Sequence, residues 1–147
     1  MLQILAATSN KHKVEEFKAA FAPLLSKMTI LTADEIHGYP DIEENGTSFE
    51  ENADIKAREA SAYADMPAFA DDSGLEVAVL NGAPGIFSAR YAGDHASDAE
   101  RIRKLLEEMK GKTNRRARFV CVIALAYRGI SVKTFRGEVN GTIIEEP

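Results

Sequence analysis

The chain has 147 residues, and 45% of them are hydrophobic, which allows one domain with a substantial buried core. The formal net charge is −5, from 23 acidic and 18 basic side chains. This balance argues against a protein that binds the backbone of a polymeric nucleic acid through bulk charge. It is compatible with a small phosphorylated ligand, because such a ligand needs only a few well-placed cations.

Cysteine content and hydropathy bear on the compartment. The one cysteine, Cys121, has no partner for an intramolecular disulfide, which is typical of a reducing compartment. It lies in the apolar run 119–126, and this run predicts that Cys121 is a buried, small hydrophobic residue. The sequence contains no apolar run of membrane-spanning length and no basic-then-apolar leader. We therefore expect a cytoplasmic protein with no membrane partner.

The first half of the chain alternates strand-like and helix-like segments. Apolar residues recur at three- or four-residue spacing from Val14 to Leu25, which predicts an amphipathic helix behind a polar turn. Glycine, proline and asparagine mark a loop at residues 34–47. Thr47 and Ser48 offer overlapping capping boxes for a second helix that ends near residue 64. The strands predicted in this half are residues 2–7, 28–31 and 67–71.

The second half is predicted to be richer in strand. A glycine- and proline-rich loop at residues 81–93 precedes a third helix over residues 97–109. The run 117–127 is too apolar for an exposed edge strand, and Arg128-Gly129 predicts a hairpin turn. The other strands predicted here are residues 75–80, 131–137 and 138–144. The residues expected on the buried stripe of the third helix are Ile102, Leu105, Leu106 and Met109. This interleaving of strands and helices indicates an α/β fold.

The first candidate site is the join between the first strand and the first helix. Backbone N–H groups at a helix N-terminus favour an anion, as does the helix dipole. Hydroxyl and amide groups and two lysines add to this, so the corner would suit a polyphosphate. The members of the segment are Thr8, Ser9, Asn10, Lys11, His12 and Lys13. An ordinary polar loop with Ser9 or Asn10 as helix cap explains the same residues. His12 has neighbours that suggest a solvent-facing position.

The second candidate site is Asp71-Asp72-Ser73-Gly74, at the end of an apolar strand. Two adjacent carboxylates in such a place are unfavourable unless positive groups compensate them. Successive strand side chains point to opposite faces, so we expect Asp71 and Asp72 to have different partners. One could bind a metal or orient a water while the other holds a cation. A tight turn between strands explains the same residue types.

The third candidate site combines an acidic loop with the second helix. Glu43 and Glu44 supply oxygen donors of the kind that suit magnesium. Lys56 lies two turns into the helix, beside its alanines, where a long amine could reach inward. A solvated acidic loop before an ordinary amphipathic helix is the competing interpretation.

Taken together, these segments have the order and spacing of one family. The matching stretches are Thr8-Ser-Asn10 with Lys13, Glu43-Glu44, Gly46, Phe49-Glu-Glu-Asn52, Lys56-Ala57, Ala70-Asp-Asp-Ser-Gly-Leu75 and Gly82-Ala-Pro-Gly-Ile-Phe-Ser-Ala-Arg-Tyr91. Over essentially its whole length the chain resembles the inosine triphosphate pyrophosphatase family, also called Ham1-like. The last two stretches are the most specific.

The resemblance implies a fold, a reaction and partners. The fold is a mixed, strongly twisted central sheet with flanking helices and two lobes around a cleft. The reaction is hydrolysis of damaged purine nucleotides such as ITP, dITP and XTP, in which water attacks the α-phosphorus to give a nucleoside monophosphate and pyrophosphate. The implied partners are a purine nucleoside triphosphate and a second copy of the chain in a homodimer, to which the loop Gly82–Tyr91 could contribute.

The resemblance also implies a role for each matching position. Residues 8–13 would hold the triphosphate, Lys56 would neutralise phosphate charge and Ser73 would touch the substrate. Glu43 and Asp72 would belong to a Mg²⁺ site. Asp72 would also be the proton acceptor that activates water. Asp71 would support the site. These roles agree with the chemistry of phosphoryl transfer, which depends mostly on positioning and charge neutralisation.

Two departures from the family pattern affect what we expect. Ser9 stands where the family commonly has glycine. The family also continues beyond the position of Pro147, through a segment that grips the base and part of the phosphate. We therefore expect residues 1–147 to form a single domain that lacks about the last quarter of the family's length. Such a chain would keep the metal and triphosphate half of the site and lose base selectivity.

Two other functions remain open. The Maf-like nucleotide pyrophosphatases share the architecture and also bind phosphate at an N-terminal turn, although the Asp-Asp-Ser-Gly and Gly-Ala-Pro-Gly-Ile stretches favour the first family. A nucleotide-binding module without catalysis is the alternative from a different class.

Overall fold

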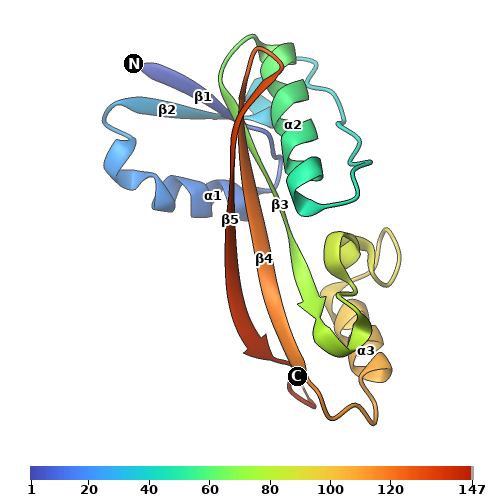
Figure 1. Ribbon diagram of the computed structural model, residues 1–147. Helices are drawn as coiled ribbons and strands as arrows, with labels where there is room; N and C mark the ends of the chain where they lie inside the picture. Colours follow the sequence, from blue (N-terminus) through green and yellow to red (C-terminus); the bar gives the residue numbers. More distant parts are fainter. Residues whose placement is uncertain (147) are drawn as a thin grey trace. The chain divides into compact units, whose positions relative to one another are not determined.

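The structure is a computed structural model that describes residues 1–146 (Figure 1). Within these residues the longer elements are β1 (Leu2–Ala6), α1 (Lys11–Ala20), β2 (Met28–Thr32), α2 (Phe49–Ala64), β3 (Ala68–Val77), α3 (Asp98–Glu108), β4 (Arg116–Tyr127) and β5 (Ile130–Thr142). Short 3₁₀ helices lie at Ala22–Leu24, Ala33–Glu35, Ala78–Leu80 and Gly85–Arg90. None of the helices described is long and apolar enough to cross a membrane.

The strands form one sheet in the order β2-β1-β3-β4-β5. β1 runs parallel to β2, with Leu2 opposite Met28, and parallel to β3, with Leu5 opposite Ala68. β4 and β5 are neighbours joined by a two-residue turn, which makes them antiparallel. The predicted mixed sheet with helices is therefore confirmed.

The chain divides into two compact units. The first contains residues 1–72 and 122–135, and the second contains residues 73–121 and the segment from Arg136 onward. β3, β4 and β5 each contribute residues to both units. The expected cleft between two lobes stays a prediction.

In the first unit, α1 and α2 cover opposite faces of the sheet. Leu5 and Ala68 pack with Ala60 of α2, whereas the next residues along each strand, Ala6 and Phe69, pack with residues of the α1 segment. This alternation is the two-residue period of a strand. The Phe69 ring meets the Phe17 and Phe21 rings edge to face, at centroid distances of 4.9 and 5.6 Å, a geometry worth about 1 kcal/mol per pair beyond burial. Three alanines of α2, Ala53, Ala57 and Ala60, are fully buried.

The β4–β5 hairpin is fastened to α2 at its turn. Arg128 and Gly129 both have positive φ, 51° and 73°, as a tight hairpin turn requires. The Gly129 N–H donates to the hydroxyl of Ser61 at 2.9 Å, and Arg58 Nε donates to the Gly129 carbonyl at 3.1 Å. The predicted hairpin is confirmed. Two side chains of α2 bind its turn, one at the N–H and one at the carbonyl group of Gly129.

In the second unit, Met109 after α3 packs with Val77 and Ala117. The predicted buried stripe of α3 is only partly right. Met109 is fully buried, but Ile102 is 43% exposed, because the helix touches the core mainly through its C-terminal end.

The structure corrects three strand-level predictions. Residues 68–77 form one strand, β3, without the turn expected at Asp72–Gly74. Residues 130–142 likewise form one strand instead of two. Cys121 is exposed and not buried. Around Cys121 the neighbours Val120 and Val122 are buried, so Cys121 lies on the opposite side of β4 from them. Further along the strand that side is covered, because Ile123 and Leu125 are partly buried and pack with the cluster that contains Phe69.

Candidate active site

The loop from β1 to α1 is ordered by its own polar side chains. Asn10 caps α1: its Oδ1 accepts hydrogen bonds from the N–H groups of His12 at 3.0 Å and Lys13 at 3.3 Å. Thr8 Oγ1 accepts from the Asn10 N–H at 3.1 Å. Asn10 is thus one of the two caps that the sequence predicted. Because the cap uses the His12 and Lys13 N–H groups, anion binding here falls mainly to side chains rather than to these helix-end donors.

Asp71 and Asp72 have different partners, as strand alternation predicted. Asp71 is 5% exposed, and its Oδ2 pairs with Lys13 Nζ of α1 at 2.7 Å. Asp72 is 7% exposed, and its Oδ2 accepts from Asn52 Nδ2 of α2 at 3.1 Å. A buried carboxylate needs such donors, because leaving it without them would cost several kcal/mol (on the order of 3–5).

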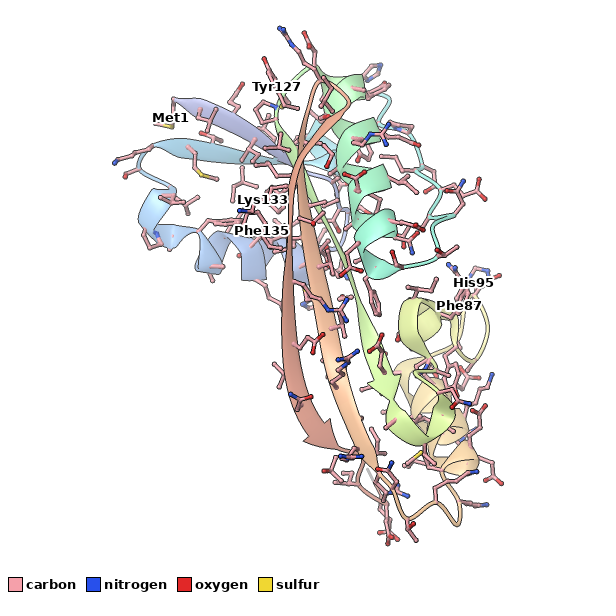
Figure 2. The ribbon with its side chains drawn as sticks, viewed as in Figure 1. Met1, Phe87, His95, Tyr127, Lys133 and Phe135 are labelled. Carbon is pink, nitrogen blue, oxygen red and sulfur yellow. The ribbon has the colours of Figure 1, made fainter. Side chains whose placement is uncertain are left out.

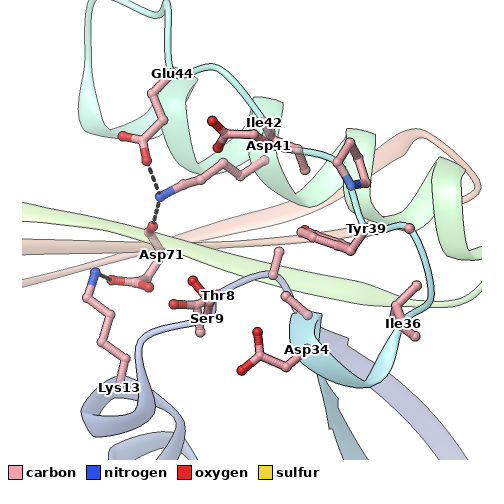
Figure 3. A pocket seen from close by; sticks show the side chains of 15 residues that line it. Thr8, Ser9, Lys13, Asp34, Ile36, Tyr39, Asp41, Ile42, Glu44 and Asp71 are labelled. Atoms are coloured by element: carbon pink, nitrogen blue, oxygen red, sulfur yellow. Dashed lines mark hydrogen bonds and ion pairs between the residues drawn. The ribbon is translucent and has the colours of Figure 1, made fainter.

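Lys56 approaches the same strand from α2. Its Nζ pairs with Glu44 Oε1 at 2.9 Å and donates to the main-chain carbonyl oxygen of Asp71. Glu44 lies in the loop that precedes α2. The prediction that Lys56 reaches inward is confirmed. The lysine links the strand that carries the aspartates to the acidic loop (Figure 3).

Asn52 has a role that the sequence analysis did not assign. It is 1% exposed and lies one turn before Lys56 on the same side of α2. Its amide nitrogen donates to Asp72, and its Oδ1 accepts from the Gly46 N–H at 2.8 Å. A Cβ on Gly46 would lie 2.7 Å from Asn52 Oδ1, so only glycine fits there without a shift. The available signal was an amide at a buried, alanine-flanked position of a helix.

A cavity of about 620 Å³ opens beside these groups, entirely within the first unit. Figure 3 shows Lys13 beside Asp71 and the loop from Ile36 to Ile42 along another wall. Lys56 also lines the cavity. The charged side chains that line it are Lys13, Lys56, Asp34, Asp41, Glu44 and Asp71. Two positive and four negative groups give the lining a formal charge of −2.

The structure brings some of the predicted site residues together and leaves others apart. Those that line the cavity are Thr8, Ser9, Lys13, Lys56 and Asp71. Those that do not line it are Asn10, Lys11, His12, Glu43, Asp72 and Ser73. Lys11, His12 and Glu43 have exposed side chains, and of the two loop glutamates it is Glu44 that pairs with Lys56. Ser73 follows Asp72 in β3 and belongs to the second unit.

Tyr39 contributes an unusual hydroxyl to the cavity wall. The oxygen is buried, and it has no hydrogen-bond partner among the residues described. Burial, with a smaller contribution from the charge of Glu59, raises the pKa of Tyr39 to about 12, so the phenol is protonated at neutral pH. Its ring meets that of Tyr63 edge to face at 6.2 Å. The Tyr63 hydroxyl donates to the Gly38 carbonyl at 2.7 Å.

Comparison with known proteins agrees with this architecture. The family model described as "Ham1 family" matches residues 4–147. A dITP/XTP pyrophosphatase of Exiguobacterium sp. is 44% identical over 146 residues, 99% of this chain and 74% of that protein. A dITP/XTP pyrophosphatase of Bacillus licheniformis is 45% identical over 149 residues, covering 100% of this chain and 75% of that protein.

Solved structures give the same result. A HAM1 protein from Coxiella burnetii matches with a TM-score of 0.91 at 43% identity, over 100% of this chain and 75% of that one. The Staphylococcus aureus Ham1 protein matches with a TM-score of 0.86 at 42% identity, over 97% and 72% of the two chains. The chain therefore belongs to the Ham1 family, as its motifs indicated.

Proposed function

We propose that this chain hydrolyses purine nucleoside triphosphates of the dITP and XTP type to a monophosphate and pyrophosphate. The observation that carries the proposal is the meeting of Lys13 and Lys56 at Asp71 of β3, on the wall of one cavity. Two cations at one wall suit a polyphosphate chain, and two buried carboxylates suit proton transfer and cation binding. The names of the relatives supply the substrate class.

The lysines and the loop hydroxyls would bind the phosphates. Lys13 and Lys56 reach the cavity from two different helices, so they could contact different phosphoryl groups of one chain of phosphates. Thr8 and Ser9 add hydroxyl groups on the same wall. Fixing the substrate from several sides lowers the entropic part of the barrier.

Asp72 would accept the proton of the attacking water. Its carboxylate is oriented by the Asn52 amide, which is itself held by the Gly46 N–H. A general base needs such a fixed orientation toward the water, and this contribution is typically about 10²–10⁴-fold in rate. Asp71 would keep Lys13 in the cavity through the 2.7 Å pair.

The donor set fits a magnesium ion that binds together with the nucleotide. Among residues 1–146 no three His, Cys, Asp or Glu side chains are grouped to hold a metal on their own. Mg²⁺ typically uses one or two carboxylates plus substrate phosphates. Glu44 lines the cavity, Glu43 precedes it in the loop, and Asp72 follows the cavity residue Asp71 in β3, so these carboxylates are the candidate ligands. When bound, the ion would reduce the repulsion between the phosphate oxygens and the cavity lining, whose formal charge is −2.

The homodimer, the cytoplasmic location and the absence of a polymeric nucleic acid partner belong to the same proposal. The net charge of −5 supports the last of these. The single-domain assignment likewise remains a proposal.

The test is pyrophosphate release from ITP, dITP, XTP, ATP and GTP, each with Mg²⁺ and with EDTA. Magnesium-dependent release that prefers the first three supports the proposal. Equal turnover of all five would support catalysis without base selectivity. Binding without release would favour the non-catalytic module instead.

A further inference from the structure

The two lysines of the cavity are each paired with a carboxylate of the same cavity. Lys13 pairs with Asp71 at 2.7 Å, and Lys56 pairs with Glu44 at 2.9 Å. The pairs differ in how firmly each carboxylate is fixed. The Asp71 side chain is 6% exposed and sits in the middle of β3, whereas the Glu44 side chain is 32% exposed and sits on a loop. Glu44 is therefore the partner that can most easily move.

Lys56 keeps a second hydrogen-bond partner if its ion pair with Glu44 breaks. Its Nζ also donates to the Asp71 carbonyl oxygen, and an ammonium has three donors. Its side chain is only 14% exposed, so the amine has little freedom to turn toward solvent. Released from Glu44, Lys56 would stay in the cavity with donors directed at whatever anion occupies it.

If a phosphate and the Glu44 carboxylate both contact Lys56, the two negative groups repel each other. Two negative groups about 4 Å apart repel by several times the thermal energy in a partly buried site. The lining already carries −2, and a triphosphate adds further negative charge. A divalent cation removes this repulsion. Conversely, a cation that arrives without a phosphate must compete with Lys56 for Glu44.

We propose that Lys56 and Glu44 exchange partners when nucleotide and divalent cation bind, and that this exchange makes the two ligands depend on each other. Lys56 turns from Glu44 to the phosphate, and the charge of Glu44 is then neutralised by the cation. Glu44 is thus a positioning residue that holds Lys56 and opposes binding of nucleotide without cation. By linkage, each ligand must raise the affinity of the other by the same factor. This inference rests on the proposed function, since it takes a triphosphate as the anion.

The test measures binding and not turnover. The probes are α,β-methylene-ITP, which cannot be cleaved at the reacting bond, and Mn²⁺, each titrated alone and in the presence of the other. The variants are Glu44→Gln and Lys56→Gln. Glu16→Gln is the charge-matched control, since Glu16 is exposed on α1 and does not line the cavity.

Glu44→Gln is expected to tighten binding of the metal-free analogue by about twofold to fivefold, the factor that a partly exposed ion pair is worth. Lys56→Gln is expected to tighten binding of Mn²⁺ alone by a similar factor. Both should reduce the coupling between the ligands, and Glu16→Gln should change none of these values. A purely structural role, or simple metal or phosphate contacts, would weaken binding or leave these two affinities unchanged.

The outcomes separate the exchange from the proposed function. If Glu44→Gln leaves or weakens binding of the metal-free analogue while the unmodified protein turns over ITP, the exchange is wrong and the function stands. If the unmodified protein binds no analogue with or without Mn²⁺, both are wrong.

Discussion

Asp71 and Asp72 are adjacent in β3, yet their carboxylates are held by different helices: Asp71 by Lys13 of α1 and Asp72 by Asn52 of α2. The strand therefore sets the two acids on opposite sides and the helices fix them there. A cation partner suits a charge that remains in place. A neutral amide partner suits an acid that must gain and lose a proton, because it orients the oxygen without strongly opposing protonation.

Asp72→Asn is expected to lower kcat by at least about 10²-fold, since it removes the proton acceptor. The amide has the same shape and can still pair with Asn52, so the melting temperature should change by only a few degrees. Pyrophosphate release and thermal unfolding, monitored by circular dichroism, measure the two effects. Near-normal release by this variant would refute the role of Asp72.

Asn52→Ala is expected to reduce activity by about 10- to 100-fold, as loss of a group that orients a catalytic residue usually does. It also leaves the Gly46 N–H and the Asp72 carboxylate short of a buried partner, so we expect a loss of about 1–3 kcal/mol in unfolding free energy. Urea titration and steady-state kinetics measure these. Unchanged kinetics together with lower stability would limit Asn52 to a structural role.

Gly46→Ala tests the contact between the loop and α2. The added Cβ would meet Asn52 Oδ1 and Glu51 Cβ, each at 2.7 Å, and should cost about 1–3 kcal/mol and reduce kcat. Gly141→Ala is the matched control, because no other part of residues 1–146 comes within 4 Å of the added Cβ. It should shift stability by no more than about 0.5 kcal/mol. Equal effects of the two substitutions would contradict the steric argument.

Tyr39 of the cavity wall and Tyr63, whose ring packs against it, should respond differently to loss of the hydroxyl. Tyr63→Phe removes the bond to the Gly38 carbonyl and should cost about 1 kcal/mol. Tyr39→Phe removes a buried hydroxyl that has no partner among the residues described, so stability should be unchanged or higher. Parallel thermal unfolding of both variants is the measurement. A large loss for Tyr39→Phe would mean that its hydroxyl is bonded in solution.

Glu51 should make stability depend on pH at the start of α2. Hydrogen bonds from the backbone N–H and the hydroxyl of Thr47 lower the pKa of this carboxyl below its ordinary value. A depressed pKa means that the stabilisation is complete above the ordinary carboxyl range and is lost as pH falls through the folded-state pKa.

The measurement compares the melting temperatures of the unmodified protein and Glu51→Gln at neutral pH and below about pH 4. The unmodified protein should have the higher melting temperature at neutral pH, and the difference between the two proteins should shrink in acid. The same comparison with Glu16→Gln, an exposed residue outside any cap, should show a smaller change. A difference in melting temperature that does not change with pH would contradict the argument that the ionised Glu51 carboxylate stabilises the start of α2.

Local signals in the sequence predicted the helices well. Asn10 and Ser48 each cap a helix at a place where the residue types suggested a cap, because capping depends on a few neighbouring residues. The Ham1 motifs placed residues of three segments in one site, and Lys13, Lys56 and Asp71 do share a cavity.

The features that the sequence did not predict depend on contacts between segments that are distant in the chain. Asp72, Ser73 and Gly74 are typical of a turn, but pairing in the sheet extends β3 through them. Cys121 lies in an apolar run, yet which face of β4 is covered is decided by other elements. The choice between Glu43 and Glu44 beside Lys56 depends on the path of the loop, and composition carries no information on that path.

The position of β5 affects how the protein behaves at high concentration. It is the last strand in the sheet order, and all of its residues are exposed, including Ile130, Val132 and Phe135. Such an edge offers unpaired backbone groups to another chain. Lys133 lies over the Phe135 ring at 5.4 Å (Figure 2). Arg136 and Glu138 follow along the strand and pair with each other. These charges would oppose lateral aggregation, so solubility should depend on the charged side chains of β5.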